Sequence, residues 1–357
     1  MADRTIRLLL TLAETTGGIG RHVALLAERL PQLGVEVSVA GPVSALETVG
    51  AVSDVVSHEI PVGNAVAARR ALRPLVGDAD VVHAHGLRSG VLAAAANRRT
   101  PVVVTWHNAP LVGGVRLTAH RIAAGYAARR ADLTLGASPD LTAAARRAGA
   151  RHAQDTFVVA PPLPPASRSR EETRDDLQVG SRPMVLAIGR LQAQKRFDVL
   201  IDAAAGWQDR GERGPAVIIA GSGPDQAALK ARAEAAHAWV RFLGARDDVA
   251  DLLAAADVVV LASEWEARSL VAQEALRAGV PLVTTPVGGL PDLVGAAASF
   301  VPVGDPPALR EAVLRLVGDA DLRAQLATAG KARAATWPTV EESIAALAAT
   351  YRVLLRD

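Results

Sequence analysis

The sequence predicts an α/β fold of two doubly wound, Rossmann-like domains, each a parallel sheet between layers of helices. Short apolar runs of strand length alternate with helix-length segments through both halves of the 357-residue chain. Glycines gather where several of these strands would pass into helices, and a proline-rich, helix-breaking stretch, Pro161 to Ser167, separates the halves. We therefore place the first domain at residues 1–165 and the second at residues 166–357.

Composition excludes several classes of protein. The chain has no cysteine, which excludes disulfides and thiolate zinc sites. It has no stretch of about twenty uncharged apolar residues that would predict a transmembrane helix. The N-terminus leads directly into an apolar strand, Ile6 to Leu10, without the segments of a signal peptide. We therefore expect a cytoplasmic protein.

Charge is unevenly divided between the two halves. Residues 1–165 hold 17 arginines, no lysine and 12 acidic residues, a net charge of +5, whereas the whole chain carries +2. This excess suits an acidic acceptor or a weak peripheral contact with an anionic membrane surface, such as the inner face of the membrane. Ordinary surface charge is the alternative. No basic run alternates with aromatic residues, so we expect no nucleic-acid partner.

A glycine-rich loop follows the first predicted strand. Gly17, Gly18 and Gly20 precede a predicted helix, Arg21 to Leu33, which leads to a second strand, Glu36 to Ala40. Glycines at such a place let the backbone approach a ligand, and the helix N-terminus favours anions. The spacing is not G-x-G-x-x-G, so a dinucleotide fingerprint is not supported, and a tight turn alone is the alternative.

Two histidines lie at the end of a central predicted strand, Val81 to His83. His83 and His85 are two residues apart and so share one strand face. No third ligand stands nearby, so we expect a packed or hydrogen-bonded pair rather than a metal site. Asp78 and Asp80 spell D-x-D, but they precede the strand, at the wrong end of the sheet for a ligand, and we interpret them as loop acids.

Polar residues follow two further predicted strands at their carboxyl ends. His107 follows the apolar run Val102 to Thr105. Arg190 and Lys195 follow the strand Val185 to Ile188, and Lys195 is one of only three lysines in the chain. Arginine forks and lysine ammonium groups both suit phosphate oxygens, whereas solvated loop charges and a core histidine are the alternatives.

The remaining predicted elements continue the alternation of strands and helices. The strands are Leu133–Gly136, Ala216–Ala220 and Val240–Leu243, and the helices are 116–130, 198–207, 305–317, 321–335 and 340–355. Gly221 and Gly223 follow one of these strands, but their G-x-G lacks a third glycine, so they do not predict a dinucleotide site.

The most informative stretch is a predicted βαβ unit near residue 270. Strand Val258 to Leu261 is followed by a polar loop, and a helix then runs from Leu270 to Ala278. Ser269 is placed to cap this helix, Gly279 stops it, and a strand, 282–285, completes the unit. Its loop carries Glu266 and its helix carries Glu274, with seven residues between them. Both carboxylates can face the crevice above the strand ends, where open α/β sheets bind ligands.

This spacing resembles the E-x7-E signature of retaining GT-B glycosyltransferases of family GT4. The resemblance continues through Glu274-Ala275-Leu276, Gly279-Val280-Pro281 and Gly288-Gly289. Gly189-Arg190-Leu191 with Lys195 resembles the family's GR-L-x-x-x-K motif, and Gly221 to Pro224 resembles its GxGP turn. The resemblance covers nearly the whole chain and has four separate motif blocks in the family's order. The resemblance implies the GT-B fold, with the two domains facing a central cleft and the last helix crossing back to the first domain.

The function implied by the resemblance is hexosyl transfer from a nucleotide-diphosphate sugar, UDP- or GDP-linked, to an unidentified acceptor hydroxyl, lipid-linked or on a small molecule. Transfer would be retaining and front-face, with no cofactor and no metal. The implied catalytic residues are His107, Arg190, Lys195 and Glu266. The implied nucleotide-sugar-binding residues are Gly17, Gly18, Gly20, Gly189, Gly221, Gly223, Arg268, Ser269, Leu270, Val271 and Glu274. In this scheme the cations hold the diphosphate, Glu274 the ribose, and Glu266 and His107 the sugar.

The sequence departs from the family pattern directly after the first glutamate. The family has Gly-aromatic-Gly there, and this chain has Ala267-Arg268-Ser269, which leaves the donor sugar open. Arg268 would contact an anionic acceptor or be a plain surface residue. The alternative functions are another GT-B enzyme, such as a sugar-nucleotide epimerase or a phosphorylase, and a non-catalytic sugar-nucleotide-binding protein.

Overall fold

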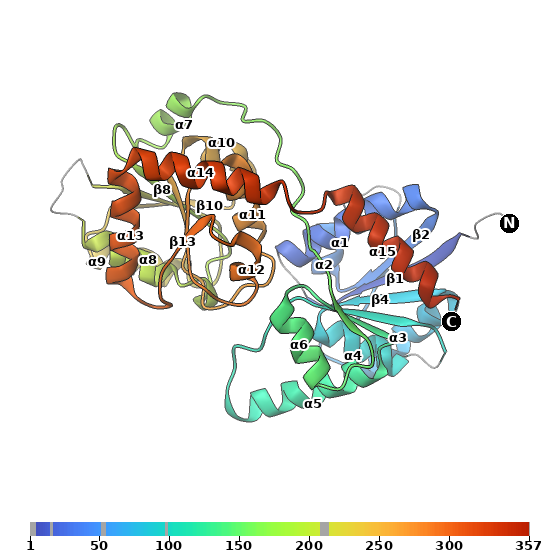
Figure 1. Cartoon of the computed structure of the whole chain (residues 1–357). Helices are drawn as coiled ribbons and strands as arrows, with labels where there is room; N and C mark the ends of the chain where they lie inside the picture. The colour runs from blue at the N-terminus through green and yellow to red at the C-terminus, as the bar shows by residue number, and fades with distance from the viewer. Residues whose placement is uncertain (1–4, 15–16, 51–54, 97–98, 208–213, 357) are drawn as a thin grey trace. The chain divides into compact units, whose positions relative to one another are not determined.

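Each half of the chain forms a doubly wound α/β unit, which confirms the predicted fold class (Figure 1). The computed structural model describes residues 5–14, 17–50, 55–96, 99–207 and 214–356. Unit 1 comprises Met1–Pro161 and Pro338–Asp357, and unit 2 comprises Pro162–Trp337. The division thus falls four residues before the expected one, and the end of the chain belongs to unit 1.

Unit 1 contains a seven-stranded sheet whose strand pairs are parallel. Its order is β3-β2-β1-β4-β5-β6-β7. The strands are β1 Ile6–Leu12, β2 Val35–Gly41, β3 Val56–Glu59, β4 Val81–His85, β5 Val102–Trp106, β6 Leu133–Gly136 and β7 Ala153–Asp155. The order reverses between β1 and β4, and such a reversal opens a crevice at the carboxyl ends of the strands.

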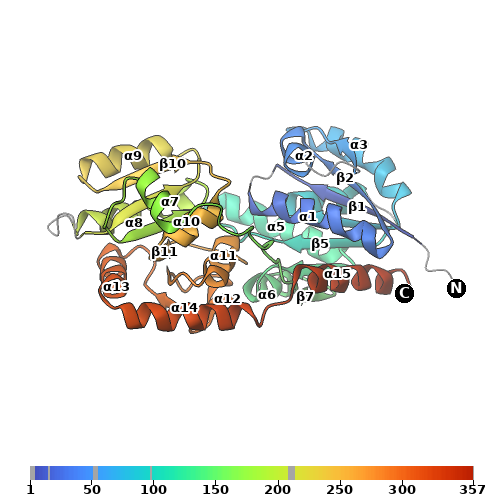
Figure 2. The same cartoon turned by 90° about the horizontal axis from the view of Figure 1, so that it is seen from above.

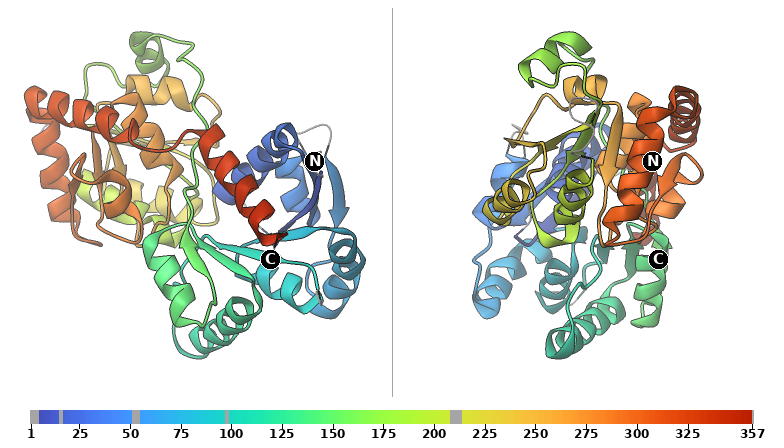
Figure 3. Two further views of the ribbon diagram at one scale, coloured as in Figure 1. Left: turned by 45° about the vertical axis from the view of Figure 1, so that its right-hand side comes forward. Right: turned by 90° about the vertical axis from the view of Figure 1, so that its left-hand side faces the viewer.

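Helices cover both faces of this sheet. They are α1 Gly18–Arg29, η1 Leu30–Leu33, α2 Val43–Val49, α3 Ala65–Asp78, α4 Leu87–Ala96, α5 Gly114–Arg130, α6 Pro139–Arg147 and α15 Val340–Leu354. Helices α3, α4 and α5 pack side by side on one face, and α1, α2 and α15 lie on the other (Figures 1 and 3). Helix α15 buries Ile344, Leu347 and Tyr351 in the core formed with β1 and α1, so the last helix is part of the core of unit 1.

Unit 2 contains a six-stranded parallel sheet of order β10-β9-β8-β11-β12-β13. Its strands are β8 Met184–Ile188, β9 Ala216–Ala220, β10 Val240–Gly244, β11 Val258–Leu261, β12 Leu282–Thr284 and β13 Ala298–Phe300. Its helices are α7 Arg170–Asp176, η2 Ala193–Lys195, α8 Phe197–Ala205, α9 Gln226–Ala235, α10 Val249–Ala255, α11 Leu270–Ala278, α12 Leu290–Val294, α13 Pro306–Gly318 and α14 Ala320–Ala334. Helices α8, α9 and α13 pack together on one face, and α7, α10, α11 and α14 lie on the other (Figures 1 and 2).

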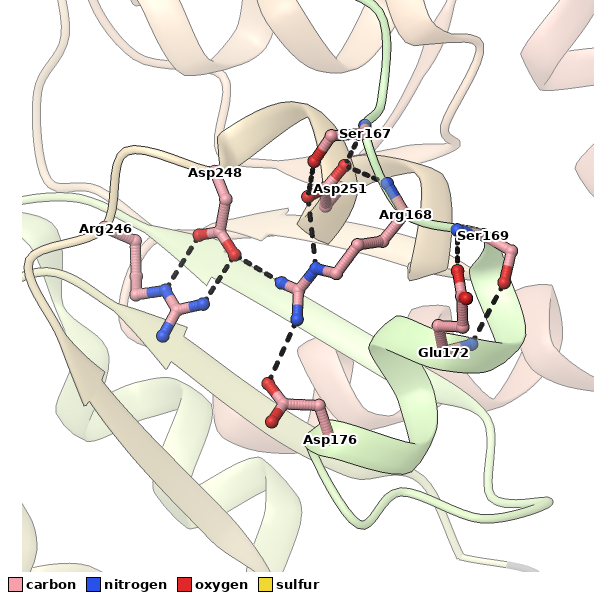
Figure 4. Close-up of polar contacts among 8 residues, drawn as sticks. All are labelled: Ser167, Arg168, Ser169, Glu172, Asp176, Arg246, Asp248 and Asp251. Carbon is pink, nitrogen blue, oxygen red and sulfur yellow. Dashed lines mark hydrogen bonds and ion pairs between the residues drawn. The ribbon is translucent and has the colours of Figure 1, made fainter.

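The first residues of unit 2 are tied to α10 by a charged network (Figure 4). The buried carboxylate of Asp251 accepts the backbone N–H of Ser167 at 2.6 Å and its hydroxyl at 2.8 Å. The Arg168 guanidinium reaches Asp251 at 3.3 Å and Asp248 at 2.6 Å. Hydrogen bonds from Arg168 and Ser167 lower the pKa of Asp251 to about 2. Ser167, the last residue of the proline-rich stretch, and its neighbour Arg168 are therefore anchored in unit 2.

The predicted bounds of one helix and one strand in unit 1 need correction. Helix α1 begins at Gly18 rather than at Arg21, and within it Gly20 packs so closely that a methyl group there would lie 2.6 Å from the Thr48 side chain. Strand β4 extends to His85, so both histidines belong to the sheet. Asp80 lies at the opposite end of β4 from His85, where its carboxylate pairs with Arg7 at 3.0 Å. This position agrees with its interpretation as a loop acid. None of the helices in the described ranges is long and apolar enough to span a bilayer.

Candidate active site

The carboxyl ends of β8 and β9 form a platform of two interlocked glycine loops. The N–H of Gly189 donates to Ala220 at 3.0 Å, and the N–H of Leu191 donates to Ser222 at 3.0 Å. A methyl group on Gly221 would lie 1.8 Å from the carbonyl oxygen of Gly189, and one on Gly223 would lie 2.2 Å from that of Leu191. Gly221 also has φ of 144°, so glycine is required here by both space and conformation. The platform holds the loop that carries the exposed Arg190.

Lys195 and Glu266, two predicted catalytic residues, meet above this platform. Their loops follow β8 and β11, neighbouring strands of the sheet, and Lys195 Nζ lies 2.5 Å from Glu266 Oε1. The hydroxyl of Ser263 donates to the same carboxylate oxygen at 2.6 Å. The side chains of Lys195 and Glu266 are only 18% and 10% exposed. Because the partners are sheltered from water, their attraction is screened less than that of a surface pair, while burial also removes hydration from both charges.

Backbone hydrogen bonds fix the loop that presents Glu266. The amide of the Gln194 side chain donates to the carbonyl of Trp265 at 2.7 Å, and the N–H of Glu264 donates to the carbonyl of Gln194 at 2.8 Å. The carbonyl of Glu266 accepts the N–H of Gly289 at 2.8 Å. A methyl group on Gly288 would lie 2.0 Å from that carbonyl oxygen. The lysine-bearing and glutamate-bearing loops are therefore joined to each other by hydrogen bonds within the protein.

Helix α11 places Glu274 behind this loop. Ser269 caps the helix by accepting the N–H of Ala272 at 3.3 Å, and Gly279 ends it with φ of 72°. Leu270 and Val271 form the first turn, and Glu274 is buried in the second, only 5% exposed. The sequence predicted both ends of this helix. Burial lowers the pKa of Arg277, and the charge of Glu274 partly opposes that effect.

Arg268 is not a plain surface residue. Its side chain is 8% exposed, and its guanidinium binds the carboxylate of Asp292 in α12 at 2.6 Å. The residue that replaces the family's aromatic side chain thus joins the glutamate loop to the helix after β12. The loop that lacks the family's glycines is therefore linked to α12 through this ion pair.

The glycine loop of unit 1 has a structural role in addition to the proposed one. Gly17 precedes α1 with φ of 89°, a conformation that favours glycine, and its carbonyl accepts the N–H of Arg21 at 3.2 Å. Gly18 opens α1, and Gly20 is buried against α2. Thr15 and Thr16 of the same loop lie outside the described residues.

Four histidines gather at the carboxyl ends of β4 and β5 in unit 1. His85 Nδ1 and His107 Nε2 are 3.1 Å apart and share a hydrogen bond. The ring of His22, from α1, lies 5.6 Å from that of His85 and 5.9 Å from that of His107 between centroids. His83 binds the Tyr351 hydroxyl at 2.7 Å and the Thr105 hydroxyl at 2.6 Å. The predicted packed pair is confirmed, because the rings of His83 and His85 are 4.1 Å apart.

Burial keeps these histidines neutral. Loss of hydration lowers the pKa of His83 to about 3 and that of His22 to about 4. It also lowers the pKa values of His85 and His107, with smaller contributions from neighbouring histidines. Among the residues that the structure describes, no three His, Asp or Glu side chains are arranged to hold a metal ion.

The structure brings together part of the predicted site and adds residues to it. Lys195, Glu266, Ser269 and Glu274 lie along the carboxyl edge of the unit 2 sheet, whereas His107 and the first glycine loop belong to unit 1. Sequence reasoning missed Ser263, whose only signal is its position three residues before Glu266 in the same loop. It also missed His22, which no strand-end pattern indicates.

Comparisons with known proteins agree with this architecture. Residues 17–162 match the family model described as glycosyl transferase 4-like domain, and residues 169–333 match the model described as glycosyl transferases group 1. The D-inositol 3-phosphate glycosyltransferase of Actinosynnema mirum is 30% identical over 93% of this chain and 85% of its own length. The alpha-D-kanosaminyltransferase of Streptomyces kanamyceticus is 31% identical over 51% of this chain and 49% of its own.

A solved structure shares the fold over nearly the full length. HepE of Anabaena, crystallised with UDP and glucose, superposes with a TM-score of 0.85 at 22% identity and covers 97% of this chain and 99% of its own. Fold and site thus define a GT-B glycosyltransferase. The chain belongs to the GT4 family of these enzymes.

Proposed function

We propose that this glycosyltransferase moves a hexosyl group from a UDP- or GDP-linked sugar to an acceptor hydroxyl, with retention of configuration and without a metal ion. The observation that carries the proposal is the sheltered Lys195–Glu266 pair above the glycine platform of unit 2. It places a cation and a carboxylate at the carboxyl ends of β8 and β11, next to a helix that carries a buried Glu274. Open α/β sheets bind nucleotides at such strand ends.

The charges at this edge suit a nucleotide diphosphate. Lys195 and Arg190 supply an ammonium and a guanidinium for the diphosphate oxygens, and the carboxylate of Glu274 suits ribose hydroxyls. The structure of similar fold from Anabaena was crystallised with UDP and glucose, and the same protein was crystallised with UDP-glucose. The relative from Actinosynnema is named as a glycosyltransferase acting on D-inositol 3-phosphate. These proteins support a nucleotide-sugar donor for this chain.

Front-face transfer needs few groups from the protein. The bond between the anomeric carbon and the β-phosphate oxygen breaks, the acceptor oxygen bonds to the same face of that carbon, and its proton passes to the departing phosphate oxygen. Lys195 and Arg190 stabilise the charge that grows on the leaving diphosphate. No enzyme nucleophile is required, unlike in retaining glycosidases. Glu266 and His107 are assigned to hold the sugar.

A weak contact with an anionic membrane is proposed for unit 1. The first nine residues of α5, 114–122, include no buried residue. Val115 and Ile122 are 86% and 70% exposed and lie one above the other, seven residues apart on the helix. Arg116 and Arg121 are exposed beside them. Exposed apolar side chains beside exposed arginines suit a weak contact with the surface of an anionic membrane.

Thermal shift with a panel of ligands in EDTA tests the donor. UDP, GDP, UDP-glucose and GDP-mannose are titrated against the wild type, Lys195→Ala and the matched control Lys230→Ala, whose lysine lies exposed on α9. Nucleotides of one base, uracil or guanine, are expected to raise the melting temperature of the wild type and of the control, because a ligand stabilises the state it binds. The same nucleotides should raise the melting temperature of Lys195→Ala less. Stabilisation that requires added manganese would contradict metal independence.

A transfer assay separates the proposal from its alternatives. Radiolabelled sugar should appear on an acceptor from a cell extract, with the nucleotide diphosphate released in equal amount. An epimerase would convert the sugar nucleotide or release the nucleotide diphosphate without an acceptor, and a phosphorylase would exchange the sugar with inorganic phosphate without using a nucleotide. A non-catalytic binding protein would do neither.

A further inference from the structure

The carboxylate of Glu266 is paired with Lys195, the side chain that the diphosphate of the proposed donor would bind. Glu266 Oε1 lies 2.5 Å from Lys195 Nζ, so a diphosphate oxygen can take the ammonium only if the carboxylate yields or shares it. The two groups are chemically alike, since both are anionic oxygens at hydrogen-bonding distance from a compact cation. Glu266 therefore competes with a donor phosphate for Lys195.

Building on the proposed function, we propose that donor binding exchanges this ion pair. A phosphate oxygen takes Lys195, and the released Glu266 carboxylate turns to accept hydroxyls of the donor sugar. Bare nucleotide diphosphate breaks the ion pair and gives Glu266 no new partner. The sugar-bearing donor gives a new partner to each residue, a phosphate oxygen to Lys195 and sugar hydroxyls to Glu266. Glu266 thus acts as a specificity-determining residue that favours the donor over the nucleotide product.

The surroundings restrict the exchange to side-chain movement. The backbone of Glu266 is fixed by the hydrogen bond from Gly289 and by the close approach of Gly288. Lys195 ends a long, flexible side chain, so its ammonium can move to a phosphate while the loop stays in place. The released carboxylate would also remain near its position, because the buried hydroxyl of Ser263 donates a hydrogen bond to it at 2.6 Å. Ser263 is accordingly a positioning residue for sugar recognition.

The same exchange in reverse would aid product release. After transfer the sugar leaves with the acceptor, and Glu266 again competes with the diphosphate for Lys195. The residue that recognises the donor sugar thereby weakens the binding of the spent nucleotide. This predicts that removing the charge of Glu266 tightens nucleotide diphosphate binding, which a residue that only touches sugar would not do.

Calorimetric titration of UDP and UDP-glucose into a double-mutant cycle tests the exchange. GDP and GDP-mannose replace them if the panel selects guanine. Glu266→Gln keeps the shape of the side chain and removes its charge. A sheltered pair worth about 1 kcal/mol corresponds to roughly fivefold in affinity, so Glu266→Gln should bind UDP about fivefold more tightly and lose the preference for UDP-glucose. In the Lys195→Met background, Glu266→Gln should change UDP affinity less than twofold, because no pair remains to be broken.

Two further variants complete the design. Glu264→Gln removes the same charge from the exposed neighbour in the loop and should leave both affinities unchanged. Ser263→Ala should leave UDP binding unchanged and reduce the preference for UDP-glucose.

Three outcomes would overturn the inference. Unchanged or weaker UDP binding by Glu266→Gln would show that the pair does not oppose the diphosphate. Equal tightening with and without Lys195 would assign the effect to general repulsion. A wild-type protein that binds neither nucleotide diphosphate would overturn the proposed donor, and with it the exchange.

Discussion

Acid should destabilise unit 1 through its buried histidines. The ring of His83 is 1% exposed and its pKa is lowered to about 3, against about 6.5 in an unfolded chain. The folded state therefore holds the neutral ring, while the unfolded state binds a proton as pH falls below 6.5. The stability linked to His83 is fully present above that value and is lost progressively as pH falls from about 6.5 toward 3.

The size of the loss follows from the two pKa values. At pH 5.5 the unfolded state gains about 1.4 kcal/mol from protonating this one histidine, compared with almost nothing at pH 7.5. His22, His85 and His107 also have lowered pKa values, so they act in the same direction. The value for His83 is thus a lower limit for the histidine cluster.

Urea unfolding at pH 7.5 and 5.5, followed by tryptophan fluorescence, measures the effect. Trp106 at the end of β5 is the one tryptophan of unit 1, whereas the other four belong to unit 2, so the change that is sensitive to His83→Asn is assigned to unit 1. The wild type is compared with His83→Asn and with His152→Gln, whose exposed histidine is the matched control. His83→Asn should be less stable at both pH values, but its loss between them should be about 1.4 kcal/mol smaller than that of wild type. Identical losses in all three proteins would refute the argument from burial.

The remaining predictions concern the glycine platform, the nucleotide and the membrane. Gly221→Ala should destabilise unit 2 by more than about 1 kcal/mol in calorimetry, because the methyl group meets backbone and the conformation suits only glycine. Gly77→Ala, in open space on α3, should be neutral or stabilising, and the reverse order would contradict this account. Glu274→Ala should weaken UDP binding about tenfold, since a charge-assisted hydrogen bond is lost, and unchanged affinity would reject its ribose role. Wild type should sediment with vesicles containing phosphatidylserine more than Val115→Ser/Ile122→Ser does, and equal sedimentation would reject a membrane contact through α5.

The sequence was most informative where apolar runs and caps agree. Strand β11 and helix α11 have the predicted bounds, because Val258 to Leu261 is a continuous apolar run and Ser269 and Gly279 mark both helix ends. Short edge strands such as β7 and β13 carry no such signal, since three partly exposed residues cannot show a pattern. Helix α3 contains Pro74 and α4 contains Gly90, residues that ordinarily indicate turns, so neither helix was predicted.

Contacts within the site were less predictable than its residue types. The chemistry of Lys195 and Glu266 was expected, but their ion pair joins residues 71 positions apart and depends on the neighbouring places of β8 and β11 in the sheet. The bond between Arg268 and Asp292 likewise depends on how α12 packs, and α12 was not predicted. The cluster around His107 also depends on packing, because α1 brings the ring of His22 to within 5.9 Å of that of His107 between centroids.

A crystal structure of the protein grown with UDP would show which side chains hold the diphosphate. We predict diphosphate oxygens at hydrogen-bonding distance from Lys195 Nζ, with the Lys195–Glu266 distance increased beyond its present 2.5 Å. We also predict the Glu274 carboxylate on the ribose hydroxyls. A nucleotide bound away from the carboxyl edge of β8 and β11, or bound there with its phosphates on neither Lys195 nor Arg190, would contradict the proposed donor site.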